Sequence, residues 1–196
     1  MRKIVYLFTL LSLSAPLTYG QDTIPKNRFG FKAGVNLSQV RSITPDEKGF
    51  SDIAVGAVFG VFWELYLADK IKFQPEILFN SVGGKTDTGN IRFNYLSIPF
   101  LFKSHGKHFG IVVGPQIGLL LSGKLKPDMN PAQDIKDQYK STDLSFILGA
   151  EYDFGKNNMF VAGLRLQYPI ANVYKDVPGS AIKNYAVSGF LGFRFK

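Results

Sequence analysis

Segments of about ten residues in which apolar and polar side chains alternate recur along most of this chain. Near the C-terminal end, for example, Leu164 and Leu166 share one parity, while Arg165 and Gln167 share the other. Because successive side chains of a strand point to opposite faces, this period indicates strands with one apolar and one mixed face. Eight such segments are found, over about residues 28–38, 53–66, 71–81, 91–103, 109–121, 143–154, 159–171 and 183–195.

The connections between these segments alternate in length. Short, turn-rich connections span residues 68–70, 104–108 and 155–158, and long ones span residues 39–52, 82–90, 122–142 and 172–182. Outer-membrane barrels have an even number of antiparallel strands, joined by short periplasmic turns and longer external loops. The sequence therefore predicts an all-β fold, an eight-stranded antiparallel up-and-down transmembrane β-barrel whose N-terminus lies on the periplasmic side.

Aromatic residues provide a third, independent indication of a membrane barrel. Aromatic rings favour the headgroup level of a bilayer, where an apolar ring body and a polar edge are both satisfied. The apolar face offers one aromatic residue at each predicted periplasmic strand end: Phe29, Trp63, Phe73, Phe102, Phe109, Phe154, Phe160 and Phe195. We interpret these eight residues as an aromatic girdle at the periplasmic boundary.

A soluble, lipocalin-like barrel is the competing all-β interpretation, with the apolar face turned inward and the mixed face in water. Parity alone does not separate the two arrangements. The mixed face, however, is rich in glycine, as at Gly34, Gly114 and Gly163. Small residues relieve crowding inside a narrow barrel but cover a surface poorly, which favours apolar residues outside, facing lipid.

The N-terminal segment has the features of a secretory signal peptide. Arg2 and Lys3 precede an apolar run over residues 4–17, and small residues lead to a predicted cleavage site after Gly20. The run is shorter than the roughly 20 apolar residues that a spanning helix needs, which disfavours a membrane anchor. We expect removal of residues 1–20 on export, and a single barrel domain over residues 21–196 in a Gram-negative outer membrane.

Composition and charge exclude several classes of function. The formal net charge is +8, but lysine and arginine are scattered and no basic helix is evident, so we expect no nucleic-acid partner. A basic surface suits anionic lipid headgroups equally well. The absence of cysteine excludes disulfides, thiolate metal sites and a cysteine nucleophile.

The mixed face of the predicted strands carries charged residues that would point into the barrel. These are Lys32, Glu64, Lys72, Glu76, Lys103, Glu151, Asp153, Arg165 and Arg194. An eight-stranded barrel has an interior just wide enough for side chains to fill. Because desolvated charges need partners, five basic and four acidic residues predict a structural ion-pair network, mostly in the periplasmic half. A narrow polar path for ions or small solutes is the alternative.

Few residues are arranged for catalysis or metal binding. Glu151 and Asp153 lie two residues apart on one face, a spacing compatible with acid and base catalysis. The arginines expected nearby favour structural, neutralised carboxylates instead. His105 and His108 share a short turn without an evident third ligand, which indicates exposed turn residues and not a metal site. We therefore expect no catalytic residue, no metal and no cofactor.

The segment over residues 122–142 is the most suggestive of the predicted external loops. It is polar and turn-prone, with Pro127, Asp128, Asn130, Pro131, Asp134 and Asp137. Loops on a rigid scaffold commonly carry recognition, so a ligand site and a solvated loop are both open here, the solvated loop being the simpler. The acidic spacing lacks the glycine of the usual calcium loop.

Several short motifs together resemble the PorT-like outer-membrane β-barrel family found in Bacteroidota, over nearly the whole chain after residue 20. They are FKAGVNLS at residues 31–38, QPEILF at 74–79, NYLSIP at 94–99, GPQIG at 114–118 and the C-terminal stretch 189–195. Members of that family often have glutamate where this chain has Ser97. The resemblance implies an eight-stranded outer-membrane barrel, with roles from accessory functions in protein secretion to no assigned activity.

These observations predict a non-enzymatic outer-membrane protein with a structural, anchoring or secretion-accessory role, exerted through its external loops or its periplasmic rim. The expected partners are outer-membrane lipid and secretion or envelope proteins, and the barrel is expected to be monomeric. A narrow solute or ion pore is the alternative function. A lipid-modifying outer-membrane enzyme is a remote third hypothesis, because no nucleophile and base are evident in the sequence.

Overall fold

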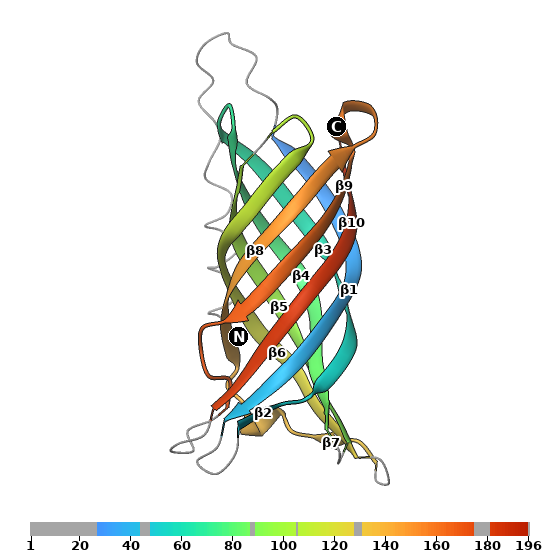
Figure 1. Cartoon of the computed structure of the whole chain (residues 1–196), viewed down its shortest axis with the longest axis vertical. Coiled ribbons are helices and arrows are strands. Elements are labelled where there is room, and N and C mark those ends of the chain that lie inside the picture. Colours follow the sequence, from blue (N-terminus) through green and yellow to red (C-terminus); the bar gives the residue numbers. More distant parts are fainter. Residues whose placement is uncertain are drawn as a thin grey trace, which may run out of the picture.

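The computed structural model describes residues 27–43, 48–86, 89–104, 106–127, 131–174 and 181–195, and in this part the chain forms a barrel of long tilted strands (Figure 1). The predicted signal peptide over residues 1–20 lies outside the described residues. The long strands are β1 (Arg28–Ile43), β3 (Asp52–Ala68), β4 (Ile71–Thr86), β5 (Gly89–Ser104), β6 (Phe109–Pro127), β8 (Thr142–Phe154), β9 (Phe160–Pro169) and β10 (Ala181–Arg194).

The eight long strands pair with their neighbours in the order β10-β9-β8-β6-β5-β4-β3-β1, and β1 pairs with β10 to close the sheet. All of these pairings are antiparallel. The closing seam runs from Gly30 opposite Arg194 to Ile43 opposite Ala181. This confirms the predicted closed, eight-stranded up-and-down barrel, which leaves no free edge among the long strands.

Shorter elements lie at the two ends of the barrel. The strand β2 (Lys48–Phe50) pairs with the end of β1, and β7 (Gln133–Asp134) pairs with the end of β6. A 3-10 turn, η2 (Lys136–Gln138), follows β7, and another, η3 (Lys156–Asn158), joins β8 to β9 at the opposite end. None of the helices in the described ranges is both long and apolar enough to span a bilayer.

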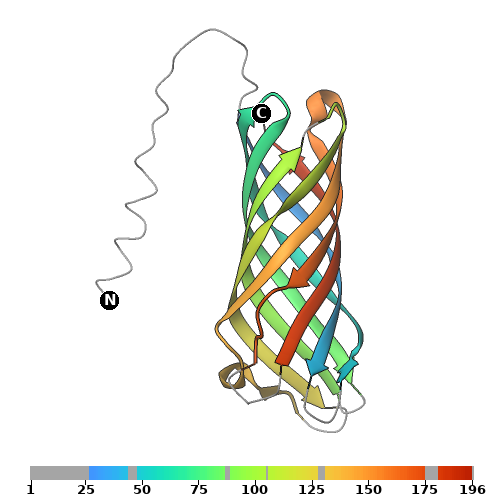
Figure 2. The same ribbon diagram turned by 60° about the vertical axis from the view of Figure 1, so that its left-hand side comes forward.

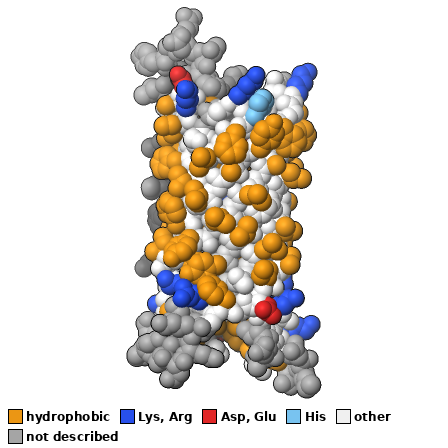
Figure 3. All heavy atoms as spheres, in the orientation of Figure 1, with side chains coloured by type: hydrophobic (Ala, Val, Ile, Leu, Met, Phe, Trp, Pro, Cys, Tyr) orange, Lys and Arg blue, Asp and Glu red, His pale blue; other side chains and the backbone are white. Residues whose placement is uncertain are grey.

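The outer surface carries a broad apolar band. Leu164, Leu191 and Trp63, on three different strands, are 65%, 64% and 51% exposed. Hydrophobic side chains cover the middle of the face in Figure 3, and lysine and arginine gather toward its two ends. Such a surface is unfavourable in water and is satisfied by hydrocarbon, while the closed sheet leaves no strand edge unpaired in lipid.

The strands continue past their predicted ends at the side of the long connections. The predicted loop over residues 82–90 is wrong for most of its length, because β4 continues to Thr86 and β5 begins at Gly89. There the pattern inverts, with Val82 and Phe93 buried inside and Lys85 and Arg92 exposed outside. The strand prediction relied on an apolar outer face, so it ended each strand where the barrel wall leaves the hydrocarbon layer. The backbone hydrogen bonds between the strands continue beyond that point.

The two ends of the barrel differ as the connection lengths predict. The three turns that join β3 to β4, β5 to β6 and β8 to β9 lie at the end where the C-terminus lies, at the top of Figures 1 and 2. The elements β2, β7 and η2 lie at the bottom. Because outer-membrane barrels place short turns in the periplasm and long loops outside, we call the top the periplasmic end and the bottom the extracellular end.

Candidate functional site

The structure places the nine predicted lumen charges together inside the barrel. Their ion-paired side chains are at most 6% exposed, and ten contacts of 2.6 to 3.9 Å join them into one connected set. We call this set the charge network: Lys32, Glu64, Lys72, Glu76, Lys103, Glu151, Asp153, Arg165 and Arg194. All nine belong to the mixed face of their strands. The alternation that turns the apolar face of each strand toward lipid therefore places these charges in the lumen.

The periplasmic part of the charge network is built around Glu64 on β3. Its carboxylate contacts Arg194 Nη2 at 2.8 Å, Lys72 Nζ at 3.1 Å and Lys103 Nζ at 3.4 Å. Asp153 on β8 shares two of these partners, with Oδ1 at 2.8 Å from Arg194 Nη2 and 3.1 Å from Lys103 Nζ. Across the whole network each cation contacts one to three carboxylates, Lys103 contacting three, as buried charges require.

The middle of the network is centred on Glu76 and Glu151. Arg165 donates two hydrogen bonds to Glu76, of 2.7 and 2.8 Å, and Lys32 Nζ lies 2.6 Å from Glu76 Oε1. Glu151 connects this group to the periplasmic one, because it contacts Arg165 at 2.6 Å and Lys103 at 2.8 Å. The acid pair Glu151 and Asp153 is thus fully engaged by cations, which leaves neither carboxylate placed as a free acid or base.

Contacts between diametrically opposite strands fill the lumen at three heights. On the ring of eight long strands, β9 lies opposite β4, and β10 lies opposite β5. The Arg165–Glu76 pair crosses the lumen at the first height, and Asn80 Nδ2 donates to Gln167 Oε1 at 3.2 Å at the second. Asn184 Nδ2 donates to the Tyr95 hydroxyl at 3.2 Å at the third. Direct side-chain contacts thus bridge the lumen between opposite walls at these three heights.

Aromatic and aliphatic residues share the lumen with the charges, which the sequence analysis did not anticipate. Phe62, Phe190 and Val161 form a buried cluster, and Leu101, Val112 and Ile147 form another. Lys32 Nζ lies 4.4 Å from the centre of the Phe190 ring, and the Arg165 guanidinium lies 4.8 Å from it. Phe62 and Phe190 belong to the alternating set of residues that is otherwise mixed or polar in their strands. This position in the sequence could have indicated that their rings point inward.

Asp143 on β8 is a second omission from the predicted site. Its side chain is buried, yet within the described ranges no ion pair with lysine or arginine is found for it, and Oδ1 has no hydrogen-bond partner. Asn184 Nδ2 donates a hydrogen bond of 3.4 Å to Asp143 Oδ2. Asn184 Oδ1, like Asp143 Oδ1, has no hydrogen-bond partner within the described ranges. With Asp143 the described lumen holds five acidic residues against five basic ones, but this carboxyl lies apart from the cations.

The extracellular mouth is filled by apolar residues, some of them from the loops. We call this group the mouth cluster: Val40, Val82, Phe93, Tyr95, Leu120, Ile135, Tyr139, Val173 and Ala186. The ring of Tyr139 packs 4.6 Å from Phe93 and 5.5 Å from Tyr174, centre to centre. Burial, and to a smaller extent the nearby Tyr174, raises the pKa of the Tyr139 phenol above its ordinary value. The loops thus close the mouth over the polar lumen.

One small cavity lies beside the charge network. A cavity of about 20 Å³ is lined by Asn80, Gln116, Arg165 and Gln167, among others. This is room for about one water molecule. Arg165 Nε and Gln74 Oε1 have no protein partner within the described ranges, and a bound water is the natural partner for such atoms.

The eight aromatic residues of the predicted girdle lie at the periplasmic strand ends. Phe29 is the register partner of Trp63, Phe73 of Phe102, and Phe154 of Phe160. Phe109 is the register partner of Tyr152, which adds a ring to the set, and Phe195 stacks on Phe29 at 5.9 Å. Seven of the eight are exposed and Phe73 is half-buried, so the rings face outward at one height.

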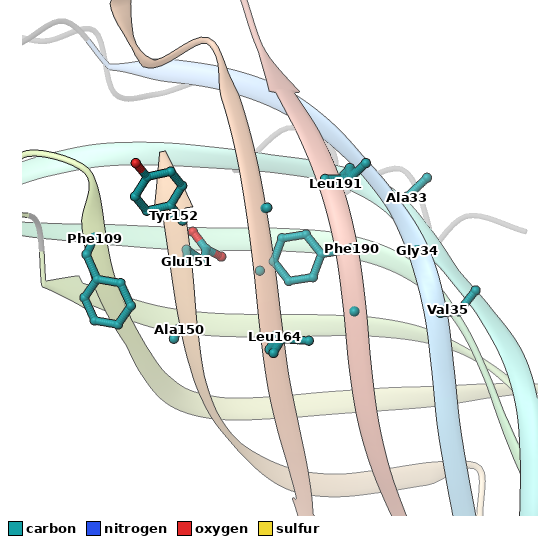
Figure 4. Close-up of a pocket in the computed structure, with 13 residues that line it drawn as sticks. Ala33, Gly34, Val35, Phe109, Ala150, Glu151, Tyr152, Leu164, Phe190 and Leu191 are labelled. Carbon is teal, nitrogen blue, oxygen red and sulfur yellow. The ribbon is translucent and has the colours of Figure 1, made fainter. Parts of the chain in front are cut away.

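A hollow on the lipid-facing surface extends over β8, β9, β10 and β1 (Figure 4). It has a volume of about 610 Å³ and arises where small outward residues such as Ala33, Ala150 and Ala162 stand among larger ones. Its one charged lining residue, Glu151, belongs to the charge network inside. The hollow therefore offers an apolar surface to acyl tails and no reactive group.

Among the described residues, the remaining candidates from the sequence do not assemble into a metal site. His105 lies outside the described residues, and His108 is exposed, with Nδ1 3.1 Å from the carbonyl of Asp153. In the described ranges no group of three histidine, aspartate or glutamate residues could hold a metal ion. Of the loop residues, Asp128 and Asn130 are not described, and the Asp134 carboxylate accepts a hydrogen bond from the Lys136 amide at 2.9 Å.

Solved structures of bacterial outer-membrane proteins are similar to this chain. Neisserial surface protein A is 10% identical, with a TM-score of 0.51, and the match covers 85% of this chain and 97% of that one. Ail of Yersinia pestis is 12% identical with a TM-score of 0.46, covering 87% and 99% of the two chains. OprG of Pseudomonas aeruginosa is 10% identical with a TM-score of 0.45, covering 86% and 96%. At this identity, the likeness to Neisserial surface protein A supports the fold alone.

Family membership rests on the sequence match. No curated protein sequence matches the chain. Residues 21–175 match the model of the family described as outer membrane protein beta-barrel domain. The match covers most of the chain and agrees with the closed barrel and its apolar outer band. This protein is therefore an outer-membrane β-barrel and belongs to the outer membrane protein beta-barrel domain family.

Proposed function

We propose that this protein is a non-conducting, non-enzymatic barrel that serves a structural, anchoring or secretion-accessory role in the outer membrane. It would act as a single barrel through its extracellular loops or its periplasmic rim. The motifs that resemble the PorT-like type support the secretion-accessory form of this role. At Ser97, where members of that type often carry glutamate, Ser97 Oγ instead accepts a hydrogen bond of 3.3 Å from Asn80.

The observation that carries the proposal is the filling of the lumen by direct contacts across its width. The Arg165–Glu76 pair, the Asn80–Gln167 hydrogen bond and the Asn184–Tyr95 hydrogen bond each join opposite strands. On the extracellular side of the first two contacts lies the apolar mouth cluster, which includes Tyr95, and an ion would have to pass through it without compensation for its lost hydration. A permanent pore would require displacement of both the polar contacts and the mouth cluster.

The non-enzymatic part of the proposal is supported by the state of the lumen carboxylates. Glu64, Glu76, Glu151 and Asp153 all contact lysine or arginine, and such contacts hold the carboxylates in fixed positions. General acid or base catalysis needs a group that reaches a substrate atom. In the described part of the chain these four carboxylates are enclosed and engaged by their cations, and the Gln74 amide also donates to Glu76 and Glu151.

Planar-bilayer recording tests the non-conducting claim. The purified, refolded barrel should insert without discrete openings, whereas an open porin in the same bilayer should give them. The variants Glu76→Ala and Arg165→Ala break the cross-lumen pair and serve as comparison. Discrete openings of the unaltered protein that disappear in these variants would support the narrow pore instead.

Recovery of neighbours from native outer membranes tests the accessory role. An affinity tag placed within residues 128–130 would be exposed if this segment faces outside, and mild cross-linking would retain weak partners. Secretion components in the eluate support the secretion-accessory form. Envelope lipid without a protein partner supports a structural or anchoring form. A tag at the C-terminus controls for interference with the extracellular loops.

A further inference from the structure

Asp143 and Asn184 meet inside the barrel at the height where β9 ends. The strand β9 stops at Pro169, which has no amide hydrogen to continue the ladder, while β8 and β10 extend further toward the extracellular end (Figure 1). Asp143 lies two residues beyond Ser145, the register partner of Pro169 on β8. Asn184 Nδ2 on β10 donates to Asp143 Oδ2 at 3.4 Å. The two side chains therefore connect β8 with β10 directly, beyond the end of the strand that separates them.

Two oxygen atoms of this pair have no partner. Asp143 is 3% exposed and Asn184 is 1% exposed. Within the described residues, Asp143 Oδ1 and Asn184 Oδ1 accept no hydrogen bond. The Asn184 amide nitrogen is already used, since it donates to Asp143 Oδ2 and to the Tyr95 hydroxyl at 3.2 Å. Because buried acceptors without a partner are costly, the pair calls for a positive or hydrogen-bond-donating group from outside the chain.

This deficit distinguishes Asp143 from the polar groups around it. The next inward pair toward the periplasm, Gln116 and Ser145, is joined by a hydrogen bond of 3.1 Å. The four carboxylates of the charge network all contact lysine or arginine. Among the lumen carboxylates that the structure describes, the Asp143 carboxylate alone has no such contact. Its negative charge is therefore the one that the chain itself leaves uncompensated.

The wall beside Asp143 adds no side chain to fill the space. Gly118 on β6 is the register partner of Asp143 and belongs to the inward set of its strand. A Cβ atom at Gly118 would lie 3.2 Å from the Tyr95 ring and 3.5 Å from Asp143 Cβ. A methyl group would nearly fill this space. The glycine therefore leaves room beside the carboxylate for one small group.

We propose that Asp143 and Asn184 bind one sodium ion through Asp143 Oδ1 and Asn184 Oδ1, with water completing its coordination. Carboxylate and amide oxygens are hard ligands, which suit hard cations. The single carboxylate carries one negative charge, which a monovalent ion neutralises. A calcium ion needs about six to eight oxygen ligands, and this pair offers few of them.

The bound ion would hold β8 and β10 together where β9 no longer lies between them. Tyr95, which accepts a hydrogen bond from Asn184, is also a member of the mouth cluster. The site thus supports the closed mouth from the lumen side. It does not depend on the proposed function, because a conducting barrel would offer the same two oxygen atoms.

The test asks whether sodium stabilises the barrel through Asp143. Urea unfolding of the refolded protein in phosphatidylcholine vesicles is measured at constant pH and ionic strength, while sodium chloride replaces tetramethylammonium chloride stepwise. Asp143→Asn removes the charge and retains the shape, and Asn184→Ala removes the second oxygen ligand. Asp52→Asn makes the first change at an exposed position of the same end and serves as the control.

The unaltered barrel should unfold at a urea concentration that rises with sodium and reaches a plateau, as binding to the folded state requires. In tetramethylammonium chloride, whose cation is too bulky for the site, Asp143→Asn should be as stable as the unaltered barrel or more so. In sodium chloride that advantage should shrink, because the variant gains nothing from the ion. Asn184→Ala should need at least roughly tenfold more sodium for half of the effect. Asp52→Asn should follow the unaltered barrel.

Three results would overturn the proposal. One is a stability of the unaltered barrel that does not change with sodium; if it then falls with rising pH only while Asp143 is present, a proton satisfies the pair. Another is an equal rise in Asp143→Asn, which would place the sodium effect elsewhere. The third is saturation by calcium at a far lower concentration than by sodium, which would assign a divalent ion. If Asn184→Ala does not refold, the comparison of Asp143→Asn with Asp52→Asn decides.

Discussion

Arg165 and Glu76 face each other across the full width of the barrel, from strands that lie opposite on the ring, and two hydrogen bonds of 2.7 and 2.8 Å join them. A planar guanidinium paired with both oxygens of a carboxylate is fixed in angle as well as in distance. The pair therefore links two opposite sides of the barrel wall through the lumen. It also occupies the axis along which a solute would have to travel.

Replacement of Glu151 by glutamine should destabilise the barrel strongly. The change removes the negative partner shared by Lys103 (2.8 Å) and Arg165 (2.6 Å) and leaves their charges buried and undercompensated. Loss of one partner of a buried pair costs about 3–5 kcal/mol. Urea unfolding of the refolded protein in vesicles measures the change. A loss below about 1 kcal/mol would show that water screens the network.

Asp143→Asn provides the matched control for that experiment. It makes the same chemical change on the same strand, at a carboxyl for which the described ranges show no basic partner. A buried carboxylate without a cation is costly, and an amide of the same shape is not. We expect Asp143→Asn to be neutral or stabilising in the same unfolding assay. Equal losses for Glu151→Gln and Asp143→Asn would contradict the distinction between paired and unpaired lumen carboxylates.

Gly163→Ala should overpack the lumen. A methyl group at Gly163 would collide with the ring of Phe190, which packs beside Lys32 and Arg165. Overpacking of this kind costs about 1–3 kcal/mol. In the double variant Gly163→Ala/Phe190→Leu the collision is relieved, so the loss should be smaller than the sum of the two single losses. Strictly additive losses in a double-mutant cycle would exclude the contact as the cause.

The mouth cluster should loosen at high pH through Tyr139. Its pKa is raised above the ordinary value of about 10 by burial and by Tyr174, so the neutral phenol is favoured in the folded state. The contribution of this group to stability is present in full below the unfolded pKa and is lost as pH rises through the folded one. Protease protection of residues 131–141 should therefore fall above about pH 10. Tyr139→Phe should retain protection there, and an identical pH dependence in both proteins would contradict this role.

Much of the barrel was predictable because lipid imposes a simple rule on each strand. Alternation located all eight long strands, and connection length separated the two ends of the barrel. The same alternation identified Lys32, Glu76 and Arg165 as inward residues before any contact was known. What alternation does not supply is the partner of each charge. Partners depend on the stagger between strands, which is set by hydrogen-bond register and not by the pattern of one strand.

The extracellular part was predicted poorly for a physical reason. On the extracellular side of the hydrocarbon layer the outward residues become polar and the inward residues become apolar. The alternation around Val82 and Phe93 is therefore the reverse of the pattern expected for a lipid-facing strand. The loop residues Ile135 and Tyr139 fill the mouth only because distant segments converge on it. Asp143 was missed because a single carboxyl at a strand start resembles an ordinary loop residue.

Thiol accessibility tests most directly the central claim that the lumen is closed to water-borne solutes, because the chain has no cysteine of its own. Ser97→Cys and Ser145→Cys place a thiol at buried lumen positions, and Ser104→Cys places one at an exposed strand end. A charged, membrane-impermeant thiol reagent is added to the barrel in vesicles, and labelling is followed by mass. Complete labelling of Ser104→Cys is expected, while both lumen thiols stay unmodified. Labelling of the lumen thiols at a comparable rate would show an open aqueous path and would contradict it.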